Sequence, residues 1–248
     1  MATEDLNAYK DAYLDSFPYY WDETVLLEAY IRKLVAALSS RSKLRVLSLG
    51  IGREMVSKAI IGQLDLDEYH IVEGAADIIE RYRAQYRPPA CVHTHHAWFE
   101  QVEFERPFDA IEMGFVLEHV DDPALILQRF HRFLDPQGVL FVAVPNARSL
   151  HRLLGHALGQ MPDVYALSQS DRDLGHKRYF DAASIAALVS DCGYRIEHIH
   201  GLMLKPFTTG QLQPLREQLG DGLDRALIDV GFDLPEIANG VLIQARPA

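Results

Sequence analysis

The sequence predicts a doubly wound α/β fold built on a mostly parallel sheet, and three observations support this class. Short apolar runs of strand type alternate with segments whose apolar residues recur at helical spacing. The connections between these segments are short and carry glycine, proline and aspartate. A Gly-x-Gly turn, Gly50 to Gly52, follows the first apolar run. Strands and helices that alternate in this way form a parallel sheet with helices on both faces.

The order of these segments predicts seven strands. They are expected at residues 44–49, 69–72, 91–95, 108–113, 139–144, 194–203 and 241–245. Helices are expected at residues 23–38, from Gly52 to about 63, 76–86, 123–134 and 181–192. Asp122-Pro123 begins one helix, and Asp135 to Gly138 has the composition of a turn. Five parallel strands followed by an antiparallel pair give a Rossmann-like seven-stranded sheet with a terminal antiparallel strand.

Length and composition fit one large domain with a small appendage. The chain has 248 residues, of which 48% are hydrophobic and 24% charged, as in a globular protein with a sizeable core. Residues 1–40 are expected to form an N-terminal helical lid, and residues 41–248 to form the α/β domain. The strand–helix rhythm is lost between about 148 and 179, so this segment is expected to cover the substrate.

Charge and composition exclude several classes of partner. The formal net charge is −11 and the basic stretches are short, so nucleic acid is not expected as a partner. No apolar run approaches 18 residues, so no membrane span is expected. The acidic, polar N-terminus does not resemble a secretory signal, and the two distant cysteines fit a reducing cytoplasm. The oligomeric state is open, with a homodimer as one option.

A ligand site is predicted at the carboxyl ends of the first two strands. Gly50 and Gly52 would let backbone N–H groups approach a ligand closely. Glu73 ends the second strand, 21 residues after Gly52, where a carboxylate can accept hydrogen bonds from ribose hydroxyls. Together these residues predict an adenosine-type ligand, either NAD or S-adenosylmethionine.

Two longer stretches choose between these ligands. Residues 107–155, PFDAIEMGFVLEHVDDPALILQRFHRFLDPQGVLFVAVPNARSLHRLLG, and residues 175–194, GHKRYFDAASIAALVSDCGY, carry FD, LEH, DP, LDPQG, VPN and H-x-R-x-F elements in this order. This order and spacing resemble the class I S-adenosylmethionine-dependent methyltransferases over about residues 40–200. The resemblance implies that S-adenosylmethionine is the cofactor and that the substrate is a small molecule.

The resemblance also implies contacts for individual residues. The methionine part of the cofactor would pass Gly50 and Gly52, Glu73 would hold the ribose, and Gly74 would also contact the cofactor. Ala97 and Trp98 would flank the adenine ring, and Glu112, Met113 and Gly114 would line the cofactor near its sulfonium. The first motif departs from the family, because Ser48 replaces the usual acid and Arg53-Glu54 follows in place of a third glycine. Arg53 either pairs with the cofactor's carboxylate or is a solvated arginine of the first helical turn.

Four residues are candidates for catalysis or for orienting the substrate. An oxygen acceptor must lose a proton during methyl transfer, so a base is needed there. His119 and His176 could serve as that base, although His119 could equally pack at the start of the helix. Asn146 and Tyr179 could orient a polar substrate, or they could form a strand-end turn and part of the core.

Tyrosines near the N-terminus form another candidate contact with the cofactor. Aromatic faces attract cations, so Tyr13 or Tyr20 could cover the sulfonium as part of a lid helix. The alternative is that this helix simply packs on the core.

No metal site is predicted. Cys91, His93 and His95 alternate along one strand and share a face, but no further ligand pair with suitable spacing is evident.

The sequence therefore predicts a small-molecule methyltransferase, with three alternatives left open. The enzyme could cyclise the cofactor's own aminobutyrate chain, releasing methylthioadenosine and forming azetidine-2-carboxylate. The chain could also bind the cofactor without catalysis. A nicotinamide-dependent oxidoreductase is the remaining alternative.

Overall fold

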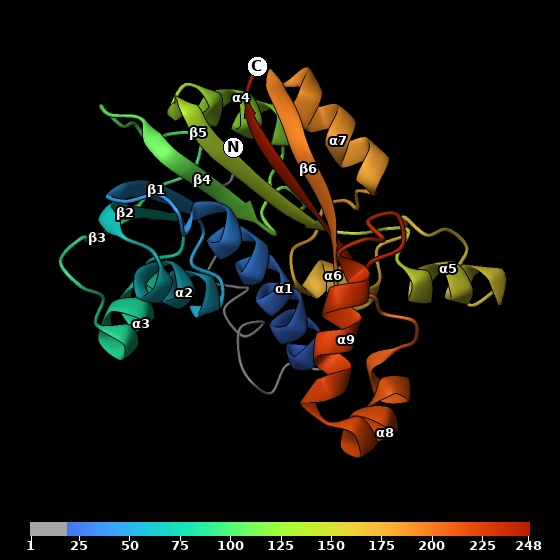
Figure 1. Ribbon diagram of the computed structural model, residues 1–248. Helices are drawn as coiled ribbons and strands as arrows, with labels where there is room; N and C mark the ends of the chain where they lie inside the picture. The colour runs from blue at the N-terminus through green and yellow to red at the C-terminus, as the bar shows by residue number, and fades with distance from the viewer. Residues whose placement is uncertain (1–18) are drawn as a thin grey trace.

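Seven strands form one sheet in the order β3-β2-β1-β4-β5-β7-β6 (Figure 1). The computed structural model describes residues 19–248. Strands β1 to β5 are parallel to one another, whereas β7 is antiparallel to both β5 and β6. Their bounds are β1 (Leu44–Leu49), β2 (Leu66–Glu73), β3 (Val92–His96), β4 (Phe108–Gly114), β5 (Leu134–Pro145), β6 (Tyr194–Leu202) and β7 (Gly240–Pro247). The predicted seven-stranded, mostly parallel sheet is confirmed.

Helices cover both faces of the sheet. On one face, α1, α2, α3 and α9 surround a hydrophobic cluster that includes Tyr30 and Tyr69. On the other face, α4 and α7 surround a second cluster that includes Phe130 and Ile185. The bounds are α1 (Tyr20–Leu38), α2 (Met55–Gln63), α3 (Ala76–Tyr86), α4 (Pro123–His131), α5 (Leu150–Ala157), α6 (Gln169–Asp173), α7 (Ala182–Asp191), α8 (Thr209–Leu219) and α9 (Asp221–Gly231).

The strand order reverses between β1 and β4, which are neighbours at the centre of the sheet. All six residues of β1 are buried, because helices cover both faces of this strand. In a doubly wound sheet the ligand crevice lies at the carboxyl ends of the strands beside such a reversal. Gly50 follows β1 and Gly114 ends β4, so the predicted motif residues lie at this position.

Local capping signals set the starts of two helices as expected. The carboxylate of Asp122 accepts the backbone N–H of Leu125 (3.0 Å), and Pro123 occupies the first helical position of α4. Asp181 caps α7 by accepting the N–H of Ser184 (2.7 Å). These contacts satisfy N–H groups that have no partner inside the helix.

The start of β5 differs from the prediction. We expected a helix to about Leu134 and a turn at 135–138, but α4 ends at His131 and β5 begins at Leu134. The ladder between β4 and β5 shifts register between Phe108 and Ala110, so residues 135–138 form an irregularity inside the strand. Gln137 donates its N–H to the Asp135 carboxylate (2.8 Å), which is the local turn contact that the sequence suggested.

The N-terminal helix belongs to the core rather than to a separate lid. Val25, Ala29, Tyr30 and Leu34 of α1 are at most 1% exposed and pack in the cluster with α2 and α3. Only the first turns of α1 reach the cavity described below. The remainder of the predicted lid, including Tyr13, lies outside the described residues.

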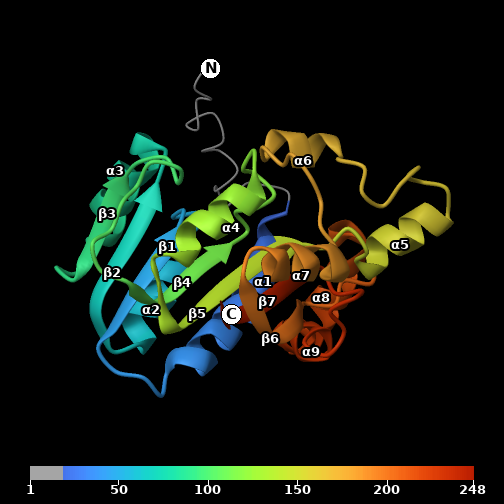
Figure 2. The ribbon, with the colours of Figure 1, turned by 90° about the horizontal axis from the view of Figure 1, so that it is seen from above.

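The segment between β5 and α7 leaves the body of the sheet. It contains α5 and α6, which extend beyond the sheet on the side opposite β3 (Figure 2). The pair β6–β7 is antiparallel, as expected for the last two strands, but α8 and α9 connect these strands in place of a tight turn. Among the helices of residues 19–248, none has the length and hydrophobicity needed to cross a membrane.

Candidate active site

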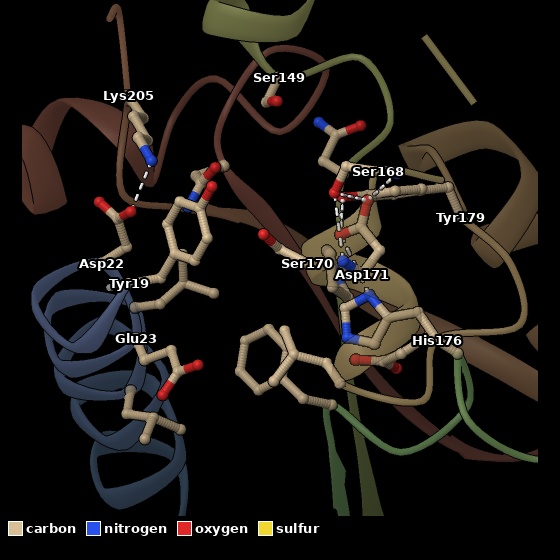
Figure 3. A pocket seen from close by; sticks show the side chains of 18 of the residues that line it. Tyr19, Asp22, Glu23, Ser149, Ser168, Ser170, Asp171, His176, Tyr179 and Lys205 are labelled. Atoms are coloured by element: carbon tan, nitrogen blue, oxygen red, sulfur yellow. Dashed lines mark hydrogen bonds and ion pairs between the residues drawn. The ribbon is translucent and has the colours of Figure 1, made fainter. Parts of the chain in front are cut away.

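A cavity of about 320 Å³ opens at the carboxyl ends of β1, β4 and β5. One wall comes from the start of α1, with Tyr19, Asp22 and Glu23 (Figure 3). The opposite wall comes from the segment between β5 and α7, which contributes residues of α6 together with His176 and Tyr179. The segment expected to cover the substrate therefore lines this cavity.

The Gly-x-Gly turn has the geometry that requires glycine. Gly50 and Gly52 have φ values of +84° and +53°, which L-residues with a side chain rarely adopt. A Cβ atom at either position would meet no atom within 4 Å, so the turn borders open space. Gly52 and Arg53 line the cavity. The turn can therefore admit a ligand against its backbone.

Arg53 is held between the first helix and the cavity. Its guanidinium donates to the backbone carbonyl of Tyr20 (3.0 Å) and lies 3.7 Å from the centre of the Tyr20 ring. The Glu23 carboxylate lies 3.5 Å away. Burial raises the pKa of Glu23 to about 7, against the opposing effect of Arg53. In this structure the Tyr20 ring therefore makes a cation–π contact with Arg53.

Glu73 ends β2 with its carboxylate turned toward the Gly-x-Gly turn. It accepts the N–H groups of Ile51 (3.1 Å) and Ala75 (2.8 Å). Burial raises its pKa above the usual range despite these hydrogen bonds. Ala97 lies beside it, donating its N–H to the Glu73 carbonyl (3.2 Å), and Trp98 begins the next turn.

The adenosine end of the predicted site is not part of the cavity. Glu73, Gly74, Ala97 and Trp98 do not line it. Their contacts with the cofactor stay predictions. The structure brings Gly52 and Arg53 of the expected methionine end into one cavity with the residues expected on the substrate side.

The end of β4 divides its residues between the core and the cavity. Met113 is fully buried in the hydrophobic cluster with α4 and α7, so its side chain does not line the cavity. Gly114 does line it, and a Cβ atom there would lie 2.9 Å from the Tyr30 ring. Glu112 is buried and accepts the Tyr30 hydroxyl (2.9 Å) and the Gly114 N–H (3.0 Å).

Glu118 is the least satisfied side chain of the cavity. It is 1% exposed, and neither carboxylate oxygen has a hydrogen-bond partner among the described residues. Burial raises its pKa to about 7, opposed in part by His176. His119 lies 4.0 Å from it, and the His119 and His176 rings meet edge to face with centroids 4.8 Å apart. Both predicted histidines therefore line the cavity around Glu118.

These three side chains could also hold a cation. Their ligand atoms lie within 4.8 Å of one another.

A second polar group fixes the wall behind His176. Asp171 lies 3.6 Å from Nδ1 of His176 and accepts the Tyr179 hydroxyl (2.8 Å). Burial would raise the pKa of Asp171, but His176, the Ser168 hydroxyl and N–H, and Tyr179 hold it well below its usual range. Arg152 donates to the Tyr179 oxygen (3.1 Å). Tyr179 is therefore engaged with Asp171 and Arg152 at the cavity wall.

Asn146 also reaches the cavity, but its amide is already committed to the backbone. Its Nδ2 donates to the carbonyls of Pro235 (3.1 Å), Glu236 (3.3 Å) and Ala238 (2.9 Å). Its Oδ1 accepts the Arg148 N–H (2.9 Å). These contacts anchor a loop after α9, and they give no support to the prediction that Asn146 takes part in chemistry.

Sequence reasoning missed an ion pair in the cavity wall. Lys205 donates to the Asp22 carboxylate (2.6 Å), with side chains only 6% and 7% exposed. Thr209 donates to the same oxygen (2.5 Å). The signal was a lysine inside the apolar run LMLKPF, where a buried charge needs a partner.

Two further wall residues offer polar atoms to a ligand. Ser149 Oγ and His151 Nδ1 are buried and have no hydrogen-bond partner among residues 19–248. Burial lowers the pKa of His151 to about 3, with Lys205 and Arg152 acting in the same direction. The neutral imidazole and the hydroxyl can each bind a polar ligand group.

Comparison with known proteins agrees with the geometry of this site. Residues 24–199 match the model of a family described as a methyltransferase domain. A protein from Xylella fastidiosa named ubiquinone biosynthesis O-methyltransferase is 30% identical over 187 residues, which cover 72% of this chain and 70% of that protein.

Solved structures share the fold at low sequence identity. The magnesium protoporphyrin IX methyltransferase of Synechocystis with bound S-adenosylhomocysteine superposes with a TM-score of 0.62 and 13% identity, covering 98% of this chain and 94% of that chain. The [4+2]-cyclase SpnF superposes with a TM-score of 0.58 and 13% identity, covering 88% of this chain and 80% of that chain.

Proposed function

Because this chain belongs to the S-adenosylmethionine-dependent methyltransferase family, we propose that it methylates an oxygen atom of a polar small molecule bound in the cavity. Glu118 would accept the proton that the acceptor hydroxyl loses. The observation that carries this proposal is a buried carboxylate, neither oxygen of which has a hydrogen-bond partner among the described residues, beside a cavity at the strand ends. The printed name of the Xylella relative, an O-methyltransferase, supports oxygen as the attacked atom.

The residues at the strand ends fit the cofactor. S-adenosylmethionine supplies an electrophilic methyl group when it is bound. Open space beside Gly50 and Gly52 leaves room for its methionine part, and the Glu73 carboxylate lies where it can accept ribose hydroxyls. Gly114 leaves the end of β4 free of a side chain where the cavity begins. These residues would hold the cofactor at the strand ends, beside the cavity that Glu118 lines.

When the cofactor binds, Arg53 would exchange the Glu23 carboxylate for the carboxylate of the cofactor. It lies 3.5 Å from Glu23, whose raised pKa of about 7 makes this carboxylate easy to protonate. We propose that the cofactor's carboxylate takes the place of Glu23 beside Arg53. In that case Arg53→Ala lowers the affinity for S-adenosylmethionine in calorimetry, and an unchanged affinity would reject this role.

Glu118 is suited to be the base. A carboxylate whose pKa lies near 7 is ionised in part at neutral pH and still binds a proton strongly, which is the best compromise for general-base catalysis. Its burial excludes water, and proximity of the acceptor to the methyl group supplies the remaining rate enhancement. His119 and His176 flank it and would position the acceptor, with Asp171 fixing the orientation of His176.

The cavity wall supports a polar acceptor. Ser149 and His151 present buried atoms without partners, and an unpaired buried polar atom costs free energy until a ligand binds it. A hydroxylated acceptor could bind both. Substrate screening would identify this acceptor. We also propose that the protein forms a homodimer, which light scattering would detect. The two free cysteines support a reducing, cytoplasmic location.

The test is mass analysis of the products formed from S-adenosylmethionine with and without a panel of phenols, catechols and carboxylic acids. We expect S-adenosylhomocysteine only when an acceptor is present. Glu118→Gln should lower kcat by roughly 10² to 10⁴ while the affinity for S-adenosylmethionine is unchanged. Glu217→Gln, an exposed residue of α8, is the matched control.

Other products would contradict the proposal in distinguishable ways. Methylthioadenosine formed without an acceptor would identify the cyclase reaction, and failure to bind S-adenosylmethionine would identify a non-catalytic protein. If EDTA abolished the activity and a divalent cation restored it, Glu118 would be a metal ligand rather than the base.

A further inference from the structure

A cluster of three histidines and one glutamate lies on β2 and β3, away from the cavity. His70 and His93 are register partners, and His95 pairs with Val72 two residues further along the same ladder. Since side chains alternate between faces, His70, His93 and His95 project on one side of the sheet together with Glu68. None of these residues lines the cavity.

α3 packs on the other face of β2 and β3, and the connection from β3 to β4 adds no helix on the face of the cluster. In the described part of the chain, β3 is joined to β4 without an intervening helix, and β3 lies at the outer edge of the sheet (Figure 1). The cluster is bordered by aromatic rings instead. Phe104 meets His70 and His95 edge to face with centroids 5.7 Å and 5.3 Å apart, and Phe108 meets His70 at 5.3 Å. The histidines therefore have an apolar border and one open side.

The geometry matches that of transition-metal ligands. Nε2 of His70 lies 3.3 Å from a carboxylate oxygen of Glu68. Two ligands of a tetrahedral ion at about 2.1 Å are separated by roughly 3.4 Å. The ligand atoms of Glu68, His70 and His93 all lie within 4.8 Å of one another. His93 is exposed, so its ring can rotate to complete the set.

The remaining contacts hold this set in place. Nδ1 of His70 lies 2.9 Å from Nε2 of His95. In the tautomer that protonates His70 on Nδ1, this nitrogen donates to His95 and Nε2 keeps a lone pair beside Glu68. A histidine that ligates a metal characteristically donates its other N–H in this way.

Two arginines act on the carboxylate. Arg45 donates to the same Glu68 oxygen that lies beside His70 (2.6 Å). Arg106 lies 3.6 Å from the other oxygen. They hold the Glu68 carboxylate in place, while their positive charge opposes a cation and limits its affinity. The nitrogen-rich set favours zinc, nickel, cobalt or copper over magnesium or calcium.

We propose that Glu68, His70 and His93 form a binding site for a divalent transition-metal ion, with His95 as the residue that orients His70. An ion bound there would join the edge strand β3 to β2. The ladder continues from the cluster to Glu73 and His96, next to Ala97. The ion would therefore stabilise the strand ends where the adenosine part of the cofactor is expected.

The test uses the full chain without a polyhistidine tag, freed of metal with EDTA and then desalted. Zn²⁺ is titrated by calorimetry, and Co²⁺ by visible absorption. We expect one ion per chain and a rise in Tm on Zn²⁺ binding. His93→Gln should weaken binding at least tenfold and abolish the rise in Tm, and His95→Gln should weaken binding by roughly tenfold or more.

Two control variants locate the ion. His156→Gln removes an exposed histidine of α5 and should leave binding unchanged. Glu118→Gln alters the cation-capable group in the cavity and should also leave it unchanged. Absence of stoichiometric binding, equal binding in His93→Gln, or loss of binding in Glu118→Gln would each overturn the proposal. None of these readouts depends on methyl transfer.

Discussion

Ser48 on β1 and Glu112 on β4 are register partners across the parallel ladder at the centre of the sheet. Ser48 occupies the position at which the resemblance to the family implies an acid, and Glu112 places a buried carboxylate at the same level of the sheet, one strand away. It accepts the Tyr30 hydroxyl (2.9 Å), while the Ser48 hydroxyl pairs with the Tyr69 hydroxyl (2.7 Å). The departure in the first motif is thus accompanied by an acid on the adjacent strand.

Tyr30→Phe tests whether this carboxylate depends on its hydroxyl partner. Glu112 would keep the Gly114 N–H but lose the Tyr30 donor in a fully buried setting, which should lower the free energy of unfolding by about 1–2 kcal/mol. Urea denaturation measures the change. Tyr165→Phe removes a hydroxyl that bonds the Asp181 carboxylate at the surface, and it should cost less. Equal costs would show that burial of Glu112 does not matter.

Breaking the buried Asp22–Lys205 ion pair of the cavity wall should strongly lower the free energy of unfolding. Lys205→Met leaves the Asp22 carboxylate in a site that is 7% exposed, and such a variant should lose about 3–5 kcal/mol of unfolding free energy. The double variant Lys205→Met, Asp22→Leu should recover much of this loss. Arg32→Met at the exposed Arg32–Asp229 pair should cost less than about 1 kcal/mol. A double variant no more stable than Lys205→Met would contradict this account.

The raised pKa of Glu118 predicts how stability depends on pH. Because the folded state binds its proton up to about pH 7 and the usual value is 4.5, the folded protein loses stability as pH rises through this interval. The Glu118→Gln variant lacks this titrating group. Its free energy of unfolding should therefore rise relative to that of the wild type by up to about 3 kcal/mol between pH 4.5 and pH 8. Thermal or urea unfolding at both pH values measures the difference. A difference that is independent of pH would show that Glu118 is ionised throughout.

Gly52→Ala tests the cofactor turn. A residue with a side chain at φ +53° costs about 1–2 kcal/mol in backbone strain, and the added methyl group would occupy the open space expected to hold the methionine part. The affinity for S-adenosylmethionine in calorimetry should fall at least tenfold. Gly159→Ala has a similar φ of +73° and equally open surroundings at the end of α5, so it should show the strain with unchanged affinity. Equal affinities in both variants would contradict the prediction for Gly52.

Local signals predicted the framework because they act over a few residues. The glycine turn after β1, Pro123 at the start of α4 and the Asp181 cap of α7 were each visible in the sequence, and each has the expected geometry. The positions of Arg53, His119, His176 and Tyr179 around one cavity also followed from the order of the motifs. A family resemblance can predict that these residues lie near one another, because the shared fold determines where their elements end.

The contacts that give each side chain its role join distant parts of the chain. Asp22 and Lys205 are 183 residues apart, and the carbonyls that bind Asn146 come from a loop about 90 residues later. The LEH motif predicted a role for His119, whereas its neighbour Glu118 is the buried side chain whose oxygens have no hydrogen-bond partner among the described residues. Periodicity assigns a residue to an element, but burial of one neighbour rather than the other depends on how distant elements pack.

The place of β7 has a consequence for the order of folding. This strand is the last of the described strands along the chain, yet it lies between β5 and β6 and provides the hydrogen-bonded partner for both. During synthesis, β6 therefore cannot join the sheet until α8, α9 and β7 have emerged from the ribosome. Assembly of this C-terminal part of the domain is a late, long-range step, and loss of the final strand would release β6 as well.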